Sequence, residues 1–563
     1  MPPANPAVVA KAAVKRLPRG ALLGLCAVYV LAGFLGREGW KSADMVAMGF
    51  MSELAAYRTD WWQPTLVGIA SEHKALIPYW LGAWMIQLAP NQEAALWLIR
   101  LPFAVLLAVA MSGTWYGTYY LAKSPRAQPV AFAFGGQAGP SDYARTVADG
   151  GLLALIACLG LAQLGHETTP ALAQLGFMGL YFYGVSALPY GWRLAGPATL
   201  LGQIGLSLSG APTLAILYGA GCLLLGAPNR TSTEGVWSAH AARRNATATL
   251  FFGCILSAVI ATSLNLWQWS VIAPAALWID WNGYFQLLVW FTWPAWPLAL
   301  WAVWRWRGQI SSRHIALPLW LMAVTLFATL FTGSSDRTLL LGLPALASLA
   351  AFALPTLQRQ IASLIDWFTL LFFSGCGLIV WVVWVAMQTG FPSAPAANVA
   401  RLAPGFEPQF SLTLLLLAMA ATTCWAALVR WRTHRHRAAL WKSLVLPAGG
   451  AAWCWALVMT LWLPLLDYTQ GYSVLTSRVA LQLDTPGCAE VQGLGADQIA
   501  AIDWAMDREL VSVGTLVQCK WLLAQANPDG DVPPTVDATV WAAKALVRHP
   551  ADASNAVWVM QRR

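Results

Sequence analysis

The chain alternates long apolar runs with short polar segments from about residue 20 to about residue 465. Each run approaches the roughly 20 residues that a helix needs to cross a bilayer core of about 30 Å. Backbone groups in lipid must be bonded within their own segment, so we expect each run to be helical. The predicted spans are 20–36, 97–121, 150–165, 171–190, 194–208, 211–226, 247–265, 284–304, 315–332, 338–355, 364–388, 410–429 and 443–465. This pattern predicts an all-α polytopic membrane domain of about thirteen helices.

Basic residues mark one face of this predicted domain. They gather in alternate segments between the runs, which is the bias expected of cytoplasmic loops. The residues are Lys123, Arg126, Arg145, Arg193, Arg230, Arg243, Arg244, Arg305, Arg307, Arg313, Arg359, Arg430, Arg432, Arg435, Arg437 and Lys442. An odd number of spans places the two termini on opposite faces. We therefore expect a bacterial inner-membrane protein with a cytoplasmic N-terminus, an uncleaved first span and a periplasmic C-terminal segment.

Composition agrees with a membrane protein and argues against a nucleic-acid-binding protein. Hydrophobic residues make up 58% of the 563-residue chain and charged residues only 10%, against about 25% in soluble domains. The net charge of +9 does not indicate a nucleic-acid surface, because the basic residues are dispersed among short loops. Many of the 33 tryptophans lie at the ends of apolar runs, as in an interfacial aromatic belt.

After residue 465 the pattern changes to that of a small soluble domain. Residues 488–491, 519–524 and 556–560 indicate strands, and residues 496–508 indicate a helix. We therefore expect a membrane domain over 1–465 and a periplasmic α/β domain over 466–563. Seven of the nine cysteines lie in or beside apolar runs, whereas Cys488 and Cys519 lie in this tail. In the periplasm these two can form a disulfide if the fold brings them together, which spacing alone does not decide.

The first outer loop, residues 37–96, carries the polar side chains best suited to chemistry. It contains an amphipathic stretch over 42–57 and an aromatic segment over 76–88 that is too short to span and fits an interfacial helix. A carboxylate at a membrane surface can act as a base, and a cation at the same depth can bind a lipid phosphate. The loop offers Glu38 and Asp44 as acids and Lys41 and Lys74 as cations. The sequence shows no P-loop, dinucleotide-binding fingerprint or zinc-type Cys/His spacing.

Several segments resemble the GT-C membrane glycosyltransferases. They are the acid just past the first span, "DWWQP" at 60–64, "HKALIPYWLGAW" at 73–84, "IRLPFA" at 99–104, "SSDRTLLLGLPALASLAA" at 334–351 and "LPLLDYTQGYSVL" at 463–475. The resemblance is to the family-39-like bacterial branch, which includes lipid A aminoarabinose transferases and protein O-mannosyltransferases. It covers nearly the whole chain, although each motif is degenerate.

The resemblance implies roles for particular residues. Glu38 stands in the place of the family's catalytic Asp, and Asp44 in that of a second acid. Lys74 matches a phosphate-contacting lysine, Lys41 a nearby basic residue, and Arg337 a second phosphate contact. Arg100 precedes the Leu-Pro pair, where a structural role is expected. His73, Tyr79 and Asp280 are candidates for lining the acceptor site.

The sequence departs from the family pattern at three points. Glu38 is followed by Gly39 rather than by a second acid, and Lys74 by Ala75 rather than by proline. His73 stands where aminoarabinose transferases carry Glu, with no evident partner His in 266–283. These departures leave open a divergent substrate or a member without activity. No cofactor is required on this interpretation, although a divalent metal is not excluded.

Plainer interpretations of the same residues also stand. Glu38 and Asp44 can be solvated loop acids paired with Lys41, since such surface pairs are common and weak. Lys74 can be an interfacial anchor that extends its amine to the headgroups. Arg337 can pair with Asp336 or contact a lipid headgroup.

The function that these patterns favour is inverting transfer of a sugar from an undecaprenyl-phosphate donor to a periplasmic-face acceptor. The acceptor is a lipid such as lipid A, a glycan or a protein, and nucleic acid is not an expected partner. A transporter or flippase is the main alternative and predicts broken helices or ionisable residues at mid-membrane, whereas the long runs hold few. The third interpretation is a non-catalytic scaffold of the same fold.

Overall fold

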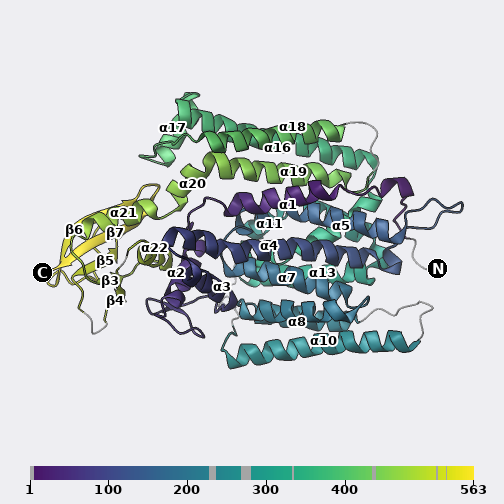
Figure 1. Ribbon diagram of the computed structural model, residues 1–563, viewed down its shortest axis with the longest axis horizontal. Coiled ribbons are helices and arrows are strands. Elements are labelled where there is room, and N and C mark those ends of the chain that lie inside the picture. Colours follow the sequence, from purple (N-terminus) through teal and green to yellow (C-terminus); the bar gives the residue numbers. More distant parts are fainter. Residues whose placement is uncertain are drawn as a thin grey trace. The chain divides into compact units, whose positions relative to one another are not determined.

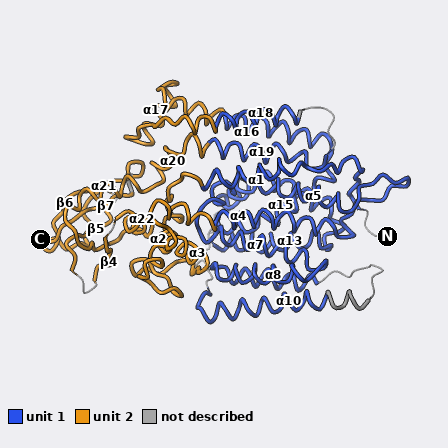
Figure 2. The backbone as a smooth tube through the Cα atoms, viewed as in Figure 1, with its two compact units in different colours: residues 1–34, 103–377, 418–457 blue, residues 35–102, 378–417, 458–563 orange. Residues whose placement is uncertain are grey.

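The computed structural model describes residues 5–226, 236–267, 281–332, 335–433, 439–506, 508–514, 518–527 and 529–563. Contacts between residues divide the chain into two compact units, which Figure 2 distinguishes by colour. Unit 1 comprises Met1–Phe34, Phe103–Gly377 and Ala418–Leu457. Unit 2 comprises Leu35–Pro102, Leu378–Leu417 and Val458–Arg563. Unit 2 thus joins the first outer loop and the C-terminal segment, although they lie far apart in the sequence.

Apart from an isolated bridge between Ala10 and Gln137, the regular secondary structure in the described part of unit 1 is helical. Its helices are α1 (Arg19–Phe34), α5 (Pro140–Ala157), α6 (Leu159–Leu164), α7 (Pro170–Ala187), α8 (Trp192–Leu208), α9 (Pro212–Leu225), α10 (Val236–Ser263), α11 (Trp281–Phe291), α12 (Ala295–Arg305), α13 (Arg313–Phe331), α14 (Asp336–Leu340), α15 (Leu343–Ala353) and α19 (Lys442–Leu457), with α4 (Gln92–Ala122), α16 (Arg359–Thr389) and α18 (Leu412–Thr433) shared with unit 2. Figure 1 shows α7, α8 and α10 side by side. Each predicted apolar run lies mainly in helix, with short breaks in some runs, so the helical multi-span architecture is confirmed.

Fewer of the predicted runs form single long helices than the sequence pattern indicated. Among the described residues, six helices are long and apolar enough to cross a membrane, or seven if the bent pair α11–α12 counts as one span. That pair turns by 91° at a break that contains Pro294, which lacks the N–H that would continue a helix. The run predicted over 150–165 is also divided, at Cys158, into α5 and α6. The count of thirteen spans stays a prediction, because several runs form helices too short to cross alone.

Small residues bring α4 and α7 into close contact within unit 1. A Cβ atom on Gly113 would lie 2.2 Å from the carbonyl oxygen of Gly179. A Cβ atom on Gly179 would lie 2.5 Å from the Cα atom of Ala110. The backbones approach too closely for a side chain at these positions, as in other membrane helix pairs that pack through small residues.

Unit 2 holds the predicted interfacial segments and the C-terminal segment. Its further helices are α2 (Ala43–Ala55), α3 (Ile77–Leu88), α17 (Ser393–Leu402), α20 (Leu463–Gln470), α21 (Ser473–Gln482) and α22 (Ala496–Ala505), with a π-helical turn at Val458–Trp462 before α20. The helices expected over 42–57 and 76–88 are therefore confirmed as α2 and α3. A two-stranded hairpin, β1 (Thr65–Leu66) and β2 (Ile69–Ala70), lies between them. The predicted domain boundary after residue 465 falls within α20, and that division stays a prediction.

The C-terminal segment forms a mixed five-stranded sheet in the order β4-β3-β5-β7-β6. Its strands are β3 (Ala489–Gln492), β4 (Leu510–Ser512), β5 (Trp521–Gln525), β6 (Trp541–His549) and β7 (Asp552–Arg562). Strands β4, β3 and β5 are parallel, while β7 runs antiparallel to β5 and β6. The three predicted strands and the predicted helix, now α22, are confirmed, whereas β4 and β6 were not predicted. Cys488 and Cys519 are joined by a disulfide beside β3 and β5.

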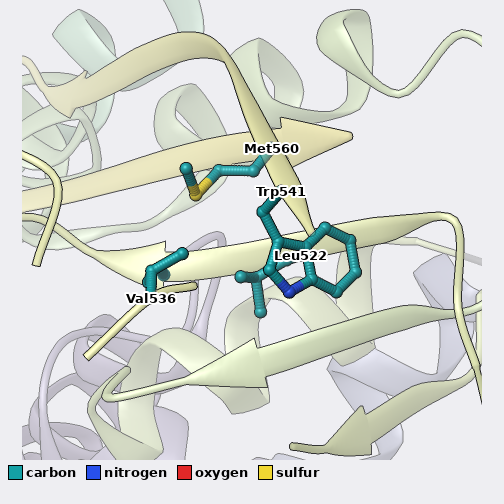
Figure 3. Packing of buried hydrophobic residues seen from close by; sticks show 5 residues of the cluster. Leu522, Val536, Trp541 and Met560 are labelled. Carbon is teal, nitrogen blue, oxygen red and sulfur yellow. The ribbon is translucent and has the colours of Figure 1, made fainter. Parts of the chain in front are cut away.

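The sheet buries its own apolar cluster. Figure 3 shows Leu522, Val536, Trp541 and Met560 packed together, and Ala524 completes the group. Helix α22 packs against α2, where a Cβ atom on Gly49 would lie 2.5 Å from the Cβ atom of Ala500. Arg58 adds ion pairs to Glu53 at 2.9 Å and to Asp503 at 2.7 Å. The first outer loop and the C-terminal segment are thus packed into one unit.

Replacing Gly179 with alanine should destabilise unit 1, because the added methyl group meets helix backbone rather than a movable side chain. We expect a loss of about 1–3 kcal/mol, which is typical of overpacking. The measurement is thermal unfolding of the purified full-length protein. The matched control is Gly375→Ala on α16, where no heavy atom lies within 4 Å. Equal melting temperatures for the two variants would contradict the close α4–α7 packing.

Candidate functional site

The candidate site begins where α1 ends. Residues 35–42 leave the helix and run alongside the segment that follows α20, with Trp40 and Gly471 paired as an isolated antiparallel bridge. The Lys41 N–H donates to the carbonyl oxygen of Gln470 at 2.9 Å. Gly471 is required there, because a Cβ atom would lie 2.5 Å from the backbone carbonyl oxygen of Asp467, and it would also lie 2.5 Å from Oε2 of Glu38. The Glu38 carboxyl group therefore lies against the backbone of the chain segment that leaves α20.

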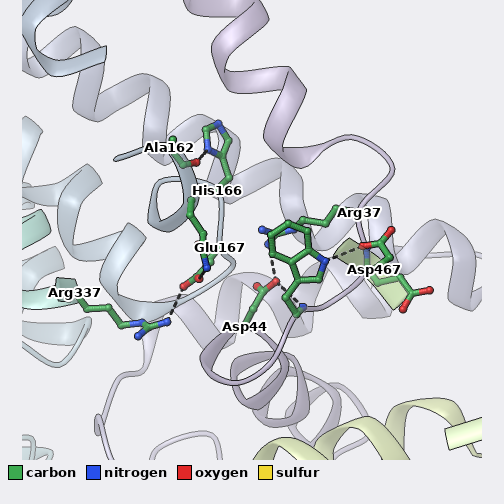
Figure 4. A network of polar contacts seen from close by, with 10 residues as sticks. Arg37, Asp44, Ala162, His166, Glu167, Arg337 and Asp467 are labelled. Carbon is green, nitrogen blue, oxygen red and sulfur yellow. Dashed lines mark hydrogen bonds and ion pairs between the residues drawn. The ribbon is translucent and has the colours of Figure 1, made fainter. Parts of the chain in front are cut away.

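Asp44 is committed to a buried ion pair. Its Oδ2 atom lies 2.6 Å from Nη2 of Arg37, and both side chains are at most 3% exposed. The same oxygen accepts the Trp40 N–H at 3.3 Å, and the Arg37 guanidinium lies 4.5 Å from the centre of the Trp40 ring. Asp44 also lies in the first turn of α2, where the helix dipole favours a negative charge. Figure 4 shows Asp44 directed toward Arg37. The arrangement favours a structural role for this acid.

Asp467 is the residue that sequence reasoning missed. It lies on α20, and its Oδ1 atom accepts the indole N–H of Trp40 at 2.7 Å and the backbone N–H of Glu38 at 3.2 Å. Arg100, which is 6% exposed, interacts electrostatically with both Glu38 and Asp467. A signal was present: Asp467 follows the last predicted apolar run as Glu38 follows the first, and the odd span count places both exits on one face.

Glu38 is a half-buried carboxyl group whose surroundings favour its protonated form. Burial raises the pKa of Glu38 above its ordinary value, and the neighbouring charge of Asp467 raises it further. A hydrogen bond from Ser473 and the charge of Arg100 act in the opposite direction. A carboxyl group with a raised pKa is a stronger base once ionised, which suits proton removal from a hydroxyl group.

Lys41 and Tyr79 have structural partners in unit 2. Nζ of Lys41 lies 3.0 Å from Oδ2 of Asp552 at the start of β7, so the charge of Lys41 is paired with an acid of the sheet. The Tyr79 ring stacks on Phe50 with centroids 5.1 Å apart, and its hydroxyl group lies 3.0 Å from Oγ of Ser71. Tyr79 is 2% exposed. These contacts attach Lys41 to the sheet and bury Tyr79 in the packing of α2 and α3.

Lys74 and His73 lie in the loop between β2 and α3. His73 is exposed and Lys74 is half-buried. Lys74 has a φ of +41°, a left-handed conformation that a non-glycine residue adopts rarely. Asp280 lies outside the described residues. Within the described ranges, no group of three or more His, Cys, Asp and Glu side chains is arranged to hold a metal ion.

Arg337 belongs to unit 1, at the start of α14. Its Nη2 atom lies 3.0 Å from Oε2 of Glu167, and its Nη1 atom lies 3.6 Å from Asp336. Glu167 is 4% exposed and follows His166, whose Nε2 atom donates to the carbonyl oxygen of Tyr29 at 2.9 Å. Figure 4 shows Arg337 and Glu167 directed toward each other. The pairing with Asp336 was expected, whereas the shorter one with buried Glu167 was not.

Comparisons with known proteins identify the fold. No family model and no curated protein sequence matches the chain. A crystal structure of ArnT from Cupriavidus metallidurans bound to undecaprenyl phosphate matches with a TM-score of 0.61 and 11% identity, over 96% of this chain and 97% of that one. The same protein in the apo state matches with a TM-score of 0.58 and 13% identity over the same shares. The resemblance to GT-C membrane glycosyltransferases is thus confirmed at the level of fold.

Removing the Asp44 carboxylate should destabilise unit 2, because Arg37 would then be buried without its closest counter-charge. For Asp44→Ala we expect a loss of about 3–5 kcal/mol, as is typical when one partner of a buried pair is removed. The control is Lys41→Met, whose pair with Asp552 is partly exposed and should contribute less than about 1 kcal/mol. The measurement is the denaturant dependence of proteolysis of the full-length protein. If Asp44→Ala were as stable as Lys41→Met, the structural role of Asp44 would be contradicted.

Proposed function

We propose that this protein transfers a sugar from a polyprenyl-phosphate donor to an acceptor hydroxyl group at the outer face of the membrane. The observation that carries the proposal is the match of 96% of the chain to the ArnT fold. One of the matching ArnT structures contains undecaprenyl phosphate. The proposal extends that class of lipid carrier to this chain. The expected membrane is the bacterial inner membrane, with the C-terminal sheet on the periplasmic side.

Glu38 is the proposed general base. Its carboxyl group takes the proton of the acceptor hydroxyl group while the acceptor oxygen forms a bond to the anomeric carbon of the sugar. The bond from that carbon to the phosphate oxygen breaks, and its electron pair leaves with the lipid phosphate. Direct displacement in one step inverts the configuration at the anomeric carbon. Glu38 suits the task better than Asp44, because Asp44 is already bound to Arg37 and Trp40.

Lys74 is the proposed partner of the departing phosphate. Negative charge develops on that phosphate in the transition state, and a cation in a water-poor site stabilises it strongly. The left-handed backbone of Lys74 supports the proposal, since such conformations cost free energy and cluster at functional sites. Lys41 is a weaker candidate because of its pair with Asp552. The role of Arg337 as a second phosphate contact stays a prediction, as do the sugar, the acceptor and the need for a metal.

The transporter alternative has one observation in its favour, the 91° break between α11 and α12. Transporters of this kind place broken helices in pairs at corresponding positions of two repeats. Among the described residues this is one bent pair, and the sequence shows no internal repeat. Transfer therefore remains the better-supported function.

Replacing Glu38 with glutamine should lower transfer by about 10²–10⁴-fold, the usual contribution of a general base. The full-length protein is reconstituted in liposomes with a panel of undecaprenyl-phosphate sugars, and release of free undecaprenyl phosphate is measured. Lys74→Met should also lower the rate, whereas Asp484→Asn, an exposed acid paired with Lys544, should leave it unchanged. Full activity in both Glu38→Gln and Lys74→Met would refute the assignment. Movement of the intact donor between leaflets without bond cleavage would indicate a flippase.

A further inference from the structure

Asp467 and Glu38 are brought together by the backbone of unit 2. One oxygen of Asp467 accepts two hydrogen bonds, from the backbone N–H of Glu38 and from the indole N–H of Trp40. The segment after α20 continues past Glu38, where the absence of a Cβ atom on Gly471 leaves room for its carboxyl group. Ser473, at the start of α21, hydrogen-bonds that group. The stretch 467–473 therefore lies along one side of the Glu38 carboxyl group.

The charges around this pair are unequal. Asp44 and Arg37 neutralise each other at 2.6 Å, and Lys41 and Asp552 do so at 3.0 Å on the sheet. Nε2 of His549, on β6, donates to the carbonyl oxygen of Gly471. The Arg100 guanidinium on α4 interacts with Asp44, Asp467 and Glu38, and the Arg37 guanidinium acts on Asp467 as well. Among the described residues this cluster therefore combines three carboxyl groups with two guanidinium groups. With one acid in excess in a water-poor setting, one acid retains its proton more readily than in water.

We propose that Asp467 is a positioning residue for the Glu38 base, holding its main chain by a hydrogen bond and placing a second negative charge beside its carboxyl group. The inference deepens the proposed function and rests on it for the role of Glu38 as base. The two hydrogen bonds that Oδ1 of Asp467 accepts from Trp40 and from the Glu38 backbone favour its charged form, so we assign the proton to Glu38. The neighbouring negative charge disfavours ionised Glu38 and raises its pKa, as burial does. A base strengthened in this way accepts the proton of a hydroxyl group more readily.

The sign of the expected pH dependence follows from this arrangement. Without the charge of Asp467, Glu38 would give up its proton at a lower pH. The acid limb of the rate profile, which requires ionised Glu38, would then shift toward lower pH. Asp467→Asn isolates this effect, because the amide oxygen of asparagine can accept the same two hydrogen bonds without the charge. If Asp467 had only a structural role, the pH at which Glu38 gives up its proton would be the same in Asp467→Asn as in the unaltered protein.

The experiment measures protonation of Glu38 without a donor. Dicyclohexylcarbodiimide reacts with protonated carboxyl groups in apolar surroundings, and mass spectrometry of the peptide containing Glu38 follows the reaction against pH. In the full-length protein, Asp467→Asn should lower the pH at half-maximal labelling by about one unit, a tenfold change in proton affinity. Asp484→Asn, which removes an exposed acid of the same unit, should leave the midpoint unchanged, and Glu38→Gln should abolish labelling at this site.

Further variants keep the inference falsifiable if Asp467→Asn is not recovered in folded form. Ser473→Ala removes a hydrogen bond to ionised Glu38 and should raise the labelling midpoint, whereas Asp467→Glu retains the charge and should keep it near that of the unaltered protein. An unchanged midpoint in Asp467→Asn would overturn the proposal, and where that variant is not folded, an unchanged midpoint in Ser473→Ala would do so, because the stretch 467–473 would then not control the protonation of Glu38. A shifted midpoint in a protein that consumes no donor would retain the positioning role and remove the proposed transferase function. If the protein consumes donor but the acid limb of its rate profile does not move in Asp467→Asn, the transferase function is retained and the positioning role of Asp467 is refuted.

Discussion

The arrangement of unit 2 depends on a buried ionic cluster that joins the beginning and the end of the membrane region. Arg37, Trp40 and Asp44 belong to the segment after α1, and Asp467 belongs to α20, more than 400 positions later in the chain. The cluster contains two hydrogen bonds to one carboxylate oxygen and one buried ion pair. Groups of this kind are costly to bury unless all of them are satisfied together, so the cluster specifies one register between the two segments. That register places Glu38 against Gly471.

This constraint separates the acidic residues of the first outer loop by role. Asp44 balances Arg37 and belongs to the framework, and Lys41 is held by Asp552 of the C-terminal sheet. The Glu38 carboxyl group instead lies near the acid Asp467 and is only partly shielded by Arg100, which is the setting that the proposed base requires. The C-terminal sheet contributes indirectly, since His549 of β6 donates to the carbonyl oxygen of Gly471 and Asp552 of β7 pairs with Lys41. Position 39, where the family that the sequence resembles carries a second acid, is glycine in this chain, and the acid beside Glu38 is Asp467, from the other end of the chain.

Much of the fold could be predicted from the sequence, because long apolar runs have few alternatives to helix in a membrane. The helices α2, α3 and α22 and the strands β3, β5 and β7 were also evident from local pattern. The span count was less predictable, since Pro294 and Cys158 divide runs that hydropathy alone treats as continuous. The site was predicted only in part. Glu38, Asp44 and Lys74 came from motif position. The partner Asp467 had only the indirect signal of following the last apolar run, and the partner Glu167 had none, because both make contacts with residues far away in the chain. Strand β6 was missed because its buried and exposed positions alternate only weakly, and its pairing with β7 cannot be seen in its own sequence.

The central claim is that Glu38 lies at the site where the lipid phosphate of a donor binds. The most direct test is a cryo-electron microscopy structure of the full-length protein in lipid nanodiscs containing undecaprenyl phosphate. We expect phosphate density in contact with Nζ of Lys74, with the Glu38 carboxyl group facing the same solvent-accessible space. Phosphate density bound elsewhere, with Glu38 enclosed by protein on every side, would contradict the account.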